Sequence, residues 1–577
     1  MIPLQQLNSL DTAQFVTALG AIYEHSPWVP ERVASQRPFA TLWALHQAMS
    51  GAVAQAGPAA QLALIRAHPE LAGKAAIRGD LTPESTSEQK GAGLSACTPQ
   101  QYAQLQSLNA AYNQRFGFPF ILAVKGHTPD SVIAELARRV EHDVEREREV
   151  ALLQIGRIAR FRLSELIDEP PGEQLLSMAA ELAQYSEDST GLTCSYLTPA
   201  HRATALQIRD YMLAAGLEVR IDAVGNVVGT LAGDGTSPRR LLTGSHYDTV
   251  INGGKYDGRL GILLPIIVAG TLRRAGQRLP YTLEIIAFAE EEGVRFKSTF
   301  LGSRAIAGQF DPALLDSVDA SGVTLRAAMQ AAGLDSTHIQ SIARDPAALL
   351  GYVEVHIEQG PVLLDAGLAV GVVSSIAGSV RSLVTVKGLA GHSGTVPMPL
   401  RHDAAAGAAE IVLAVEKRCS SMPGLVGTVG RLEVPGGAIN VIPGRCELSI
   451  DIRAGEDGPR DAAHADVAAQ IIEIAARRGL VIEQRKVLEA ASVACAPALQ
   501  QALAASVLRI TGQPAMLLPS GAGHDAMMIA SITPVGMLFV RCGNGGISHH
   551  PDETCSAADA GIAADVFQDL LLNFQVT

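Results

Sequence analysis

The sequence contains few cysteines and no C-x-x-C pair. Seven cysteines are scattered over 577 residues, and their number is odd. This pattern disfavours a disulfide framework or a zinc ribbon and is typical of reduced thiols in the cytosol.

Long apolar runs are also missing. The most apolar stretch, residues 260–270, is too short to span a bilayer and contains Pro265. The N-terminus has neither the basic segment nor the apolar segment of a signal peptide. A cytoplasmic protein without a membrane partner is therefore expected.

Positive charge is scarce, because 45 Lys and Arg residues stand against 58 Asp and Glu residues, a net charge of −13. This balance disfavours nucleic acid and anionic membranes as partners. It gives no help in attracting an anionic substrate, so a site for one must supply its own local cations.

The length is too great for one hydrophobic core, so two or three domains are expected. Residues 1–166 carry helical apolar patterns throughout, including one that starts at Asp11 and one for which Asp130 is the expected N-cap. A Pro-Pro pair then predicts an extended linker over residues 167–173. The first half is therefore predicted to be an all-α domain.

Beyond the linker, short apolar runs alternate with helical patterns. Runs such as residues 240–244 and 283–288 suit strands of a sheet that is covered by helices on both faces. An α/β domain is predicted from residues 174–379 and 495–577. Residues 380–494 interrupt it with a β-α-β-β-α-β pattern, the ferredoxin-like order, and are expected to form an inserted α+β domain.

Ligand-type side chains gather where the predicted strands end. The clusters contain His246 with Asp257, the run Glu290-Glu291-Glu292, His356 with Glu358, and the pair His549-His550. The carboxyl ends of strands in open α/β sheets are where ligands bind, and converging imidazoles and carboxylates suit a pair of divalent ions. Two such ions acidify a water molecule, whose proton a neighbouring carboxylate then takes. The clusters thus predict a dinuclear metal hydrolase.

Each cluster alone has a simpler explanation. A lone histidine at a strand end is usually structural, and a run of three glutamates is usually a solvated turn. Four such clusters in order, each after a predicted strand, favour the metal site.

A resemblance to a known family rests on nine segments: GSHYDTV, KYDGRLGI, EEEGVRF, GSRAIAG, HIEQGPVL, GHSGTVPM, NVIPG, GAGHDA and GISHHPDE. They resemble the allantoate amidohydrolase and N-carbamoyl-amino-acid hydrolase family, within the clan of two-metal aminoacylases and carboxypeptidases. The resemblance covers roughly residues 173–577, spacing included. It implies an aminoacylase/carboxypeptidase-like fold in which residues 380–494 form a lid that also makes a homodimer.

The resemblance also implies the metal ligands. One ion would be held by His246, Asp257 and His356, and the other by Asp257, Glu292 and His549, with Asp257 bridging the two. Glu291 would be the general base, and His550 only a neighbour of the ligand. The mixed ligand set suits Mn²⁺ or Zn²⁺, with the carboxylates favouring Mn²⁺.

Substrate contacts are implied for five residues: Gln359, His392, Asn440, Arg453 and His524. Arg453 would clamp a substrate carboxylate and supply the missing local cation. His392 would polarise the scissile carbonyl, in its own site or in that of the partner subunit. Without the family, an exposed histidine, a turn asparagine and a strand-surface arginine would be the simpler interpretations.

The helical half carries a second set of motifs: His68-Pro69, Ser85-Thr86-Ser87-Glu88-Gln89, Phe116 to Ile121 and Ile158 to Leu163. Together they resemble the OHCU decarboxylase family, OHCU being 2-oxo-4-hydroxy-4-carboxy-5-ureidoimidazoline. That family needs no cofactor and produces (S)-allantoin.

The roles implied in this half follow the residue types. His68 would be the acid/base, because its ordinary pKa lies near neutrality. Glu88 and Gln89 would orient the hydroxyl and ureido groups, Ser85 of the same motif would contact the substrate, and the backbone around Ile121 would bind the ring. Arg162 would hold an anionic group, with Arg160 as its rival.

The fusion narrows the hydrolase substrate from several ureido compounds to allantoate, the ring-opened form of allantoin. Alternatives stay open: an N-carbamoyl-L-amino-acid hydrolase, a ureidoglycolate amidohydrolase, or a helical half that is only a tether. No allantoinase domain is recognised in the sequence, so direct channelling between the two sites is not implied.

Overall fold

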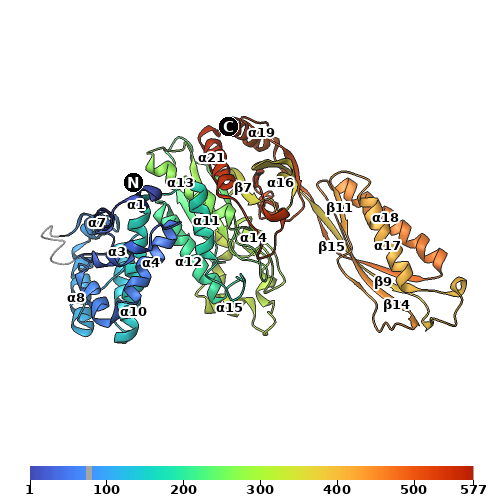
Figure 1. Cartoon of the computed structure of the whole chain (residues 1–577), viewed down its shortest axis with the longest axis horizontal. Helices are drawn as coiled ribbons and strands as arrows, with labels where there is room; N and C mark the ends of the chain where they lie inside the picture. Colours follow the sequence, from blue (N-terminus) through green and yellow to red (C-terminus); the bar gives the residue numbers. More distant parts are fainter. Residues whose placement is uncertain (73–80, 576–577) are drawn as a thin grey trace.

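The computed structural model describes residues 1–72 and 81–575, which form three bodies in a row (Figure 1). A helical body lies at one end, an α/β body in the middle and a smaller α+β body at the other end. No helix in the described residues combines the length and the apolarity needed to cross a membrane.

The N-terminal body is helical, as predicted. Its elements are β1 (Ile2–Pro3), α1 (Leu4–Ser9), α2 (Thr12–Leu19), α3 (Trp28–Val33), α4 (Leu42–Ala54), α5 (Gly57–Ala67), α7 (Pro83–Gly91), α8 (Pro99–Phe116), α9 (Pro129–Arg139), α10 (Val144–Leu166) and β2 (Ile167–Asp168). Asp11 caps α2 through a reciprocal capping box with Gln14. The prediction that Asp130 is the N-cap of α9 was wrong. Thr128 caps that helix, because Pro129 takes the first helical position.

The segment after α10 is shorter than the predicted linker. Ile167 and Asp168 pair with Ile2 and Pro3 as parallel strands. The next helix, α11 (Pro171–Leu182), begins at Pro171, so the prediction of an extended chain as far as residue 173 was wrong. Proline is tolerated in the first helical turn because its missing N–H would have no helical partner there.

The middle body contains one nine-stranded sheet in the order β16-β8-β18-β7-β5-β6-β4-β3, with β17 beside β8. Its strands are β3 (Glu218–Ile221), β4 (Val227–Leu231), β5 (Arg240–His246), β6 (Thr282–Phe288), β7 (Leu349–Ile357), β8 (Val370–Ile376), β16 (Val493–Ala494), β17 (Leu517–Ser520) and β18 (Val535–Val540). The central strands β18, β7, β5 and β6 run parallel. Their carboxyl ends therefore meet at one edge of the sheet.

Helices cover both faces of this sheet, as expected from its continuous apolar strands. They are α11, α12 (Pro199–Ala214), α13 (Leu260–Arg274), α14 (Leu301–Ile306), α15 (Leu325–Ala331), α16 (Val362–Ala366), α19 (Pro497–Thr511), α20 (Ala526–Ile529) and α21 (Ala557–Asn573). Leucines and isoleucines of α13 and α21 share one core with the strands, while Ile306, Leu363 and Ile529 belong to a second core.

The third body, which we call the lid, is inserted between β8 and β16. Its elements are β9 (Gly378–Lys387), β10 (Gly391–His392), α17 (Ala404–Cys419), β11 (Leu425–Thr428), β12 (Leu432–Glu433), β13 (Val441–Ile442), β14 (Arg445–Ala454), α18 (Asp457–Arg478) and β15 (Val481–Ala490). The main sheet has the order β11-β14-β9-β15, and α17 and α18 pack on one of its faces. Apolar side chains on the strands, such as Val426 and Leu383, are exposed.

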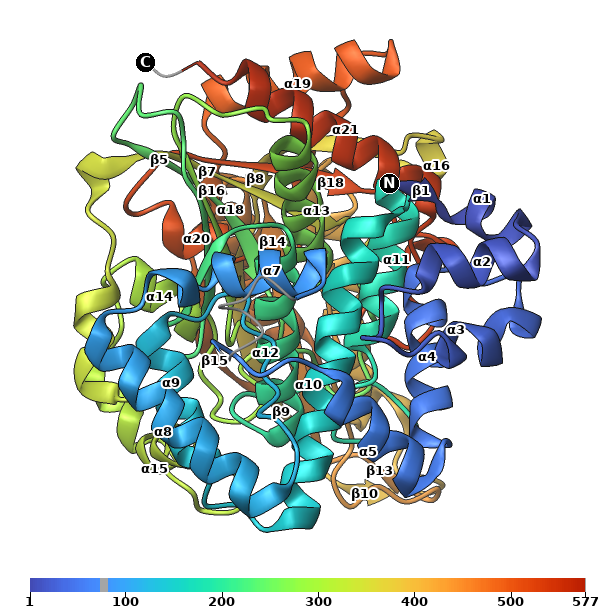
Figure 2. The ribbon, with the colours of Figure 1, turned by 90° about the vertical axis from the view of Figure 1, so that its left-hand side faces the viewer.

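The helical body packs against the middle body along one side. Helix α4 contacts α11, and α10 contacts α12 (Figure 2). Two ion pairs cross this seam, one between Arg157 and Asp210 at 2.8 Å and one between Arg160 and Glu181 at 3.2 Å.

Candidate functional site

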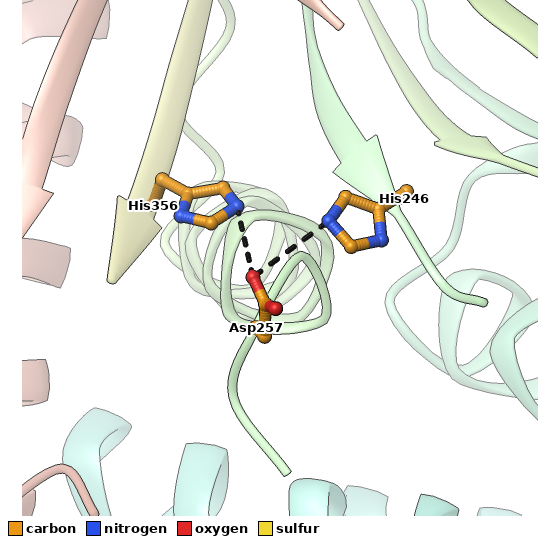
Figure 3. A group of neighbouring side chains, drawn as sticks. All are labelled: His246, Asp257 and His356. Atoms are coloured by element: carbon orange, nitrogen blue, oxygen red, sulfur yellow. Dashed lines mark ion pairs between the residues drawn. The ribbon is translucent and has the colours of Figure 1, made fainter. Parts of the chain in front are cut away.

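Two histidines from neighbouring strands face one aspartate. His246 is the last residue of β5, His356 is the next-to-last residue of β7, and Asp257 lies in the loop before α13. Figure 3 shows both imidazoles directed at Asp257. The Nε2 atoms of His246 and His356 lie 3.8 Å and 3.5 Å from its Oδ1. These three side chains form one candidate ligand group, as predicted from their strand ends.

A second group forms on the other oxygen of the same aspartate. Nε2 of His549 lies 3.1 Å from Oδ2 of Asp257 and 3.6 Å from Oε1 of Glu292. Ligand atoms of His246, Glu291 and Glu292 also lie within 4.8 Å of one another. Asp257 thus offers one oxygen to each group, which is the arrangement a bridging ligand requires.

The local backbone allows this close approach. Gly258 follows Asp257 with φ of +64°, and a Cβ there would lie 2.5 Å from the His246 ring. Gln359 and His549 also adopt left-handed backbone, with φ of +57° and +54°. Such conformations are costly for residues other than glycine and concentrate at functional sites.

Neighbouring groups fix the orientation of the two histidines. Nδ1 of His246 lies 3.2 Å from the carbonyl oxygen of Asp248, and Nδ1 of His356 lies 2.8 Å from that of Ile357. Each Nδ1 therefore carries the proton, and each Nε2 keeps a free lone pair that a metal ion shared with Asp257 would accept.

Two acidic residues that were not predicted from the sequence hold the backbone of the site in place. Asp248 accepts hydrogen bonds from the backbone N–H groups of Glu291 and Glu292. Buried Glu553 accepts from the backbone N–H of Asp257 at 3.0 Å and from the Ser548 hydroxyl at 2.7 Å. Both lie in recognised motifs, GSHYDTV and GISHHPDE, but only the fold shows which loops they join.

The donor set fits divalent cations. Asp257, Glu291 and Glu292 converge, yet among the described residues no Lys or Arg forms an ion pair with any of them. Burial, together with the neighbouring Asp257, raises the pKa of Glu292 to about 7. Buried carboxylates without cationic side chains are unfavourable unless they bind metal, so this cluster of imidazoles and carboxylates can hold two ions.

The predicted substrate residues fall into two sets. Gln359 donates from Nε2 to Oδ1 of Asp257 at 3.0 Å, and the His524 ring lies 4.5 Å from that of His356. Arg453 pairs with Asp451 and donates to the carbonyl of Gly521, in the loop that leads to His524. Gln359 and His524 therefore lie at the metal ligands, whereas Arg453, on β14 of the lid, reaches only the loop that leads to His524.

His392 and Asn440 remain on the lid. They lie close together, because His392 pairs with Val441 and the N–H of Ser393 donates to the carbonyl of Asn440. Both side chains are exposed. Within the described residues, neither forms a hydrogen bond or ion pair with a predicted metal ligand.

All six predicted residues of the helical half line one small cavity. They are His68, Ser85, Glu88, Gln89, Ile121 and Arg162. Arg162 donates to Glu88 at 2.8 Å and 3.1 Å and to the Ser85 hydroxyl at 3.3 Å. Nδ1 of His68 lies 3.0 Å from the Leu64 carbonyl oxygen. Burial lowers the pKa of His68, so its imidazole is neutral near pH 7.

The structure separates the two rival arginines. Arg162 faces the cavity, whereas Arg160 points to Glu181 in the middle body, although it also lines a different cavity at the seam. Glu24, which was not predicted from the sequence, is buried and accepts hydrogen bonds from Arg162, Ser85 and Thr82. Hydrogen bonds from Thr82 and Arg162 hold the pKa of Glu24 below its usual value, although burial opposes them. Glu24 lies in a loop far from Ser85 and Arg162 in the sequence, and no motif around it indicates that it contacts them.

Comparisons with known proteins agree with this geometry. Residues 242–573 match the model of peptidase family M20/M25/M40, more than half of the chain. The chain belongs to this family. Residues 8–164 match the OHCU decarboxylase model, so a decarboxylase-family domain precedes the hydrolase, and both predicted resemblances are confirmed.

Among similar proteins, an N-carbamoyl-L-amino acid amidohydrolase of Geobacillus stearothermophilus is 40% identical over 68% of this chain and 96% of its own. An allantoate deiminase of Arabidopsis thaliana is also 40% identical, over 68% of this chain and 80% of its own. A hydantoinase/carbamoylase family amidase from Burkholderia multivorans has a similar structure, with a TM-score of 0.65 and 31% identity over 70% of this chain and 97% of its own.

Proposed function

We propose that the chain is a bifunctional enzyme of ureide breakdown. The helical body would decarboxylate OHCU to (S)-allantoin, and the M20-family half would hydrolyse allantoate to ureidoglycine or its product ureidoglycolate, ammonia and CO2. One observation carries the proposal: an OHCU decarboxylase domain is fused to a hydrolase similar to an allantoate deiminase. The two reactions flank allantoin and its ring-opened form. Seven free cysteines support a reducing, cytoplasmic setting.

In the hydrolase half, Glu291 would be the general base. It lies beside His246 and Glu292 but stands outside the Asp257 bridge, which suits a proton acceptor rather than a ligand. Two bound ions, Mn²⁺ or Zn²⁺, would polarise the ureido carbonyl and acidify a water molecule. Glu291 takes the proton of the attacking water, the C–N bond breaks, and the same carboxyl returns the proton to the leaving nitrogen.

Substrate binding would combine groups of the middle body and the lid. Arg453 supplies a guanidinium beside the His524 loop, which suits a substrate carboxylate. Gln359 and His524 would hold the ureido group. His392 and Asn440 would reach it by lid movement or from the partner subunit of a dimer, because they are exposed on the lid.

In the helical half, neutral His68 would act as the acid/base that transfers a proton to or from the substrate when CO2 is lost. The departing carboxylate leaves carbanion character next to carbonyl and imine groups, which delocalise it. Glu88 and Gln89 would orient the substrate, while Glu24 and Ser85 position Arg162. All five N–H donors of Arg162 already have acceptors, on Glu24, Glu88, Ser85 and the carbonyl of Ala21, so Arg162 would bind a substrate anion only by giving up one of these partners.

A second candidate function is N-carbamoyl-L-amino-acid hydrolysis. It is favoured by the 40% identity to the Geobacillus stearothermophilus enzyme, which equals the identity to the allantoate deiminase. Both substrates carry a carboxylate and a ureido group, so the metal centre serves either.

The test is a substrate panel on the full chain loaded with Mn²⁺. Ammonia release from allantoate, ureidoglycolate and several N-carbamoyl-L-amino acids is compared by kcat/KM, and OHCU decarboxylation is followed in the same preparation. We expect allantoate to be preferred at least tenfold. A preference for carbamoyl amino acids would replace the allantoate assignment with the second candidate, and inert OHCU would reduce the helical half to a tether.

A further inference from the structure

The segment that joins α8 to α9 is buried although it forms neither helix nor strand around Ile121. Phe120, Ile121 and Leu122 are each at most 4% exposed, and all three line the same small cavity as His68. A buried segment without secondary structure needs partners from elsewhere in the fold for its backbone polar groups. The groups that hold this backbone therefore set the shape of one wall of the His68 cavity.

Arg139, the last residue of α9, holds this wall from outside the cavity. Its Nη1 donates to the carbonyl oxygen of Ile121 at 2.7 Å, and its Cζ lies 4.5 Å from the centre of the Phe120 ring. Arg139 is fully buried and is not one of the residues that line the cavity. It therefore contacts the wall but not a molecule bound inside.

A buried carboxylate fixes the orientation of this guanidinium. Nε and Nη2 of Arg139 both donate to Glu147, which also accepts from the hydroxyl of Tyr112. A planar guanidinium can bind a carboxylate through two N–H groups and still present a third to another acceptor, whereas the compact ammonium of lysine lacks this fork. A buried ion pair is weak evidence for stability, because apolar side chains often stabilise a core as well. Its third hydrogen bond, to Ile121, gives this pair a role in orienting the backbone.

The bond from Arg139 orients the peptide group between Ile121 and Leu122. The C=O and N–H of a planar trans peptide point to opposite sides. Because the Ile121 carbonyl is directed at Arg139, the N–H of Leu122 is directed away from Arg139. Within residues 1–72 and 81–575, this N–H has no hydrogen-bond acceptor, and Leu122 lines the cavity. The N–H is thus available to a ligand as a donor.

We propose that Arg139 is a positioning residue of the decarboxylase, which holds the Ile121–Leu122 peptide so that the Leu122 N–H donates to the substrate ring. The inference rests on the proposed function of the helical half. When CO2 leaves, the electron pair of the broken C–C bond is delocalised onto acceptor atoms of the substrate. A fixed backbone N–H next to such an atom interacts more strongly as the negative charge develops, and so stabilises the transition state.

The experiment compares variants of the full-length chain. Arg139→Lys keeps the charge beside Glu147 but removes the fork that reaches Ile121. Gln61→Met is the matched control: buried Gln61 donates to the carbonyl oxygens of Val53 and Ala54 at 3.1 Å and 3.0 Å, outside the His68 cavity. This control also frees buried carbonyl groups in the helical body.

If thermal unfolding shows that Arg139→Lys does not fold, the double variant Arg139→Met/Glu147→Gln replaces it. Removing both charges leaves no unpaired buried ion, which is the main cost of removing only one partner. The kcat and KM for OHCU are measured for each folded variant, because their separation distinguishes positioning from a purely structural role.

We expect Arg139→Lys, or the double variant, to lower kcat by about tenfold or more while KM changes by less than about threefold, because the lost interaction grows in the transition state. Gln61→Met should unfold at a lower temperature with the kcat of the wild type. A wild-type kcat in the Arg139 variant, or an equal loss of kcat in Gln61→Met, would overturn the inference alone. A wild-type chain that does not decarboxylate OHCU would refute the proposed function of the helical half, and this inference with it.

Discussion

Asp248 holds the backbone of Glu291, accepting its N–H at 3.0 Å with Oδ1. The other oxygen, Oδ2, accepts the N–H of Glu292 at 3.1 Å. Two adjacent glutamates are thereby fixed at one strand end, where successive residues can serve different roles.

The first prediction separates those roles. Glu291→Gln should lower kcat by about a thousandfold while the protein still binds two ions, because only the general base is lost. Glu292→Gln should bind fewer ions, because a ligand is lost. Metal content by mass spectrometry and ammonia release are measured together. A Glu291→Gln protein that loses metal, or one with normal kcat, would contradict the assignment.

The second prediction concerns the lid. His392→Ala should lower kcat by about a hundredfold or more, the scale of losing one group that stabilises the transition state. Its metal content and thermal unfolding should stay unchanged, since His392 is exposed and lies away from the ligands.

A mixing experiment then locates the action of His392. Inactive His392→Ala and inactive Glu291→Gln proteins are dissociated together and reassembled. Restored ammonia release is expected if His392 serves the partner's site, because a mixed dimer then contains one complete site. Activity that stays absent would place His392 in its own subunit's site.

The third prediction tests Glu24, which only the fold brings to the His68 pocket. Glu24→Gln should lower the rate of OHCU decarboxylation about tenfold or more, because Arg162 and Ser85 lose a shared charged partner. Glu31→Gln, an exposed glutamate of α3, is the control. Equal rates in the two variants would remove Glu24 from the site.

The fourth prediction is a pH profile. Burial lowers the pKa of His68, opposed by the Leu64 carbonyl and Glu24 and aided by Arg162. The neutral imidazole is the working form, so kcat/KM for OHCU should be flat from pH 8 to 6.5 and fall below that. The free energy of unfolding should depend on pH in the same direction. Below pH 6.5 the unfolded state binds more protons at His68 than the folded state does. The stability contributed by neutral His68 is therefore present above pH 6.5 and is lost as the pH falls towards the folded-state pKa. A profile that rises as the pH falls below 6.5 would contradict this role.

Much of the metal centre could be predicted because its signals are local. His246 and His356 end apolar strands that form neighbours in the sheet, and parallel strands bring their carboxyl ends together. Asp257 and His549 are loop residues, and the family motifs placed them next to the strand ends. The ferredoxin-like order of the lid likewise follows the alternation of apolar runs.

What could not be predicted depends on contacts distant in sequence. Glu24 and Arg162 meet across 138 residues, and nothing near Glu24 marks it as a partner. Arg160 and Arg162 are two residues apart on α10, yet only packing against α11 sends Arg160 to the seam. The start of α11 at Pro171 was missed because a proline pair predicts a helix end and a helix start equally well.

The most direct test of two independent active sites in one chain is removal of metal from a single preparation followed by both assays. A chelator such as dipicolinate, then dialysis, should abolish allantoate hydrolysis and leave OHCU decarboxylation unchanged, and added Mn²⁺ or Zn²⁺ should restore hydrolysis. Hydrolysis that survives complete removal of metal, or decarboxylation that is lost with it, would contradict the account.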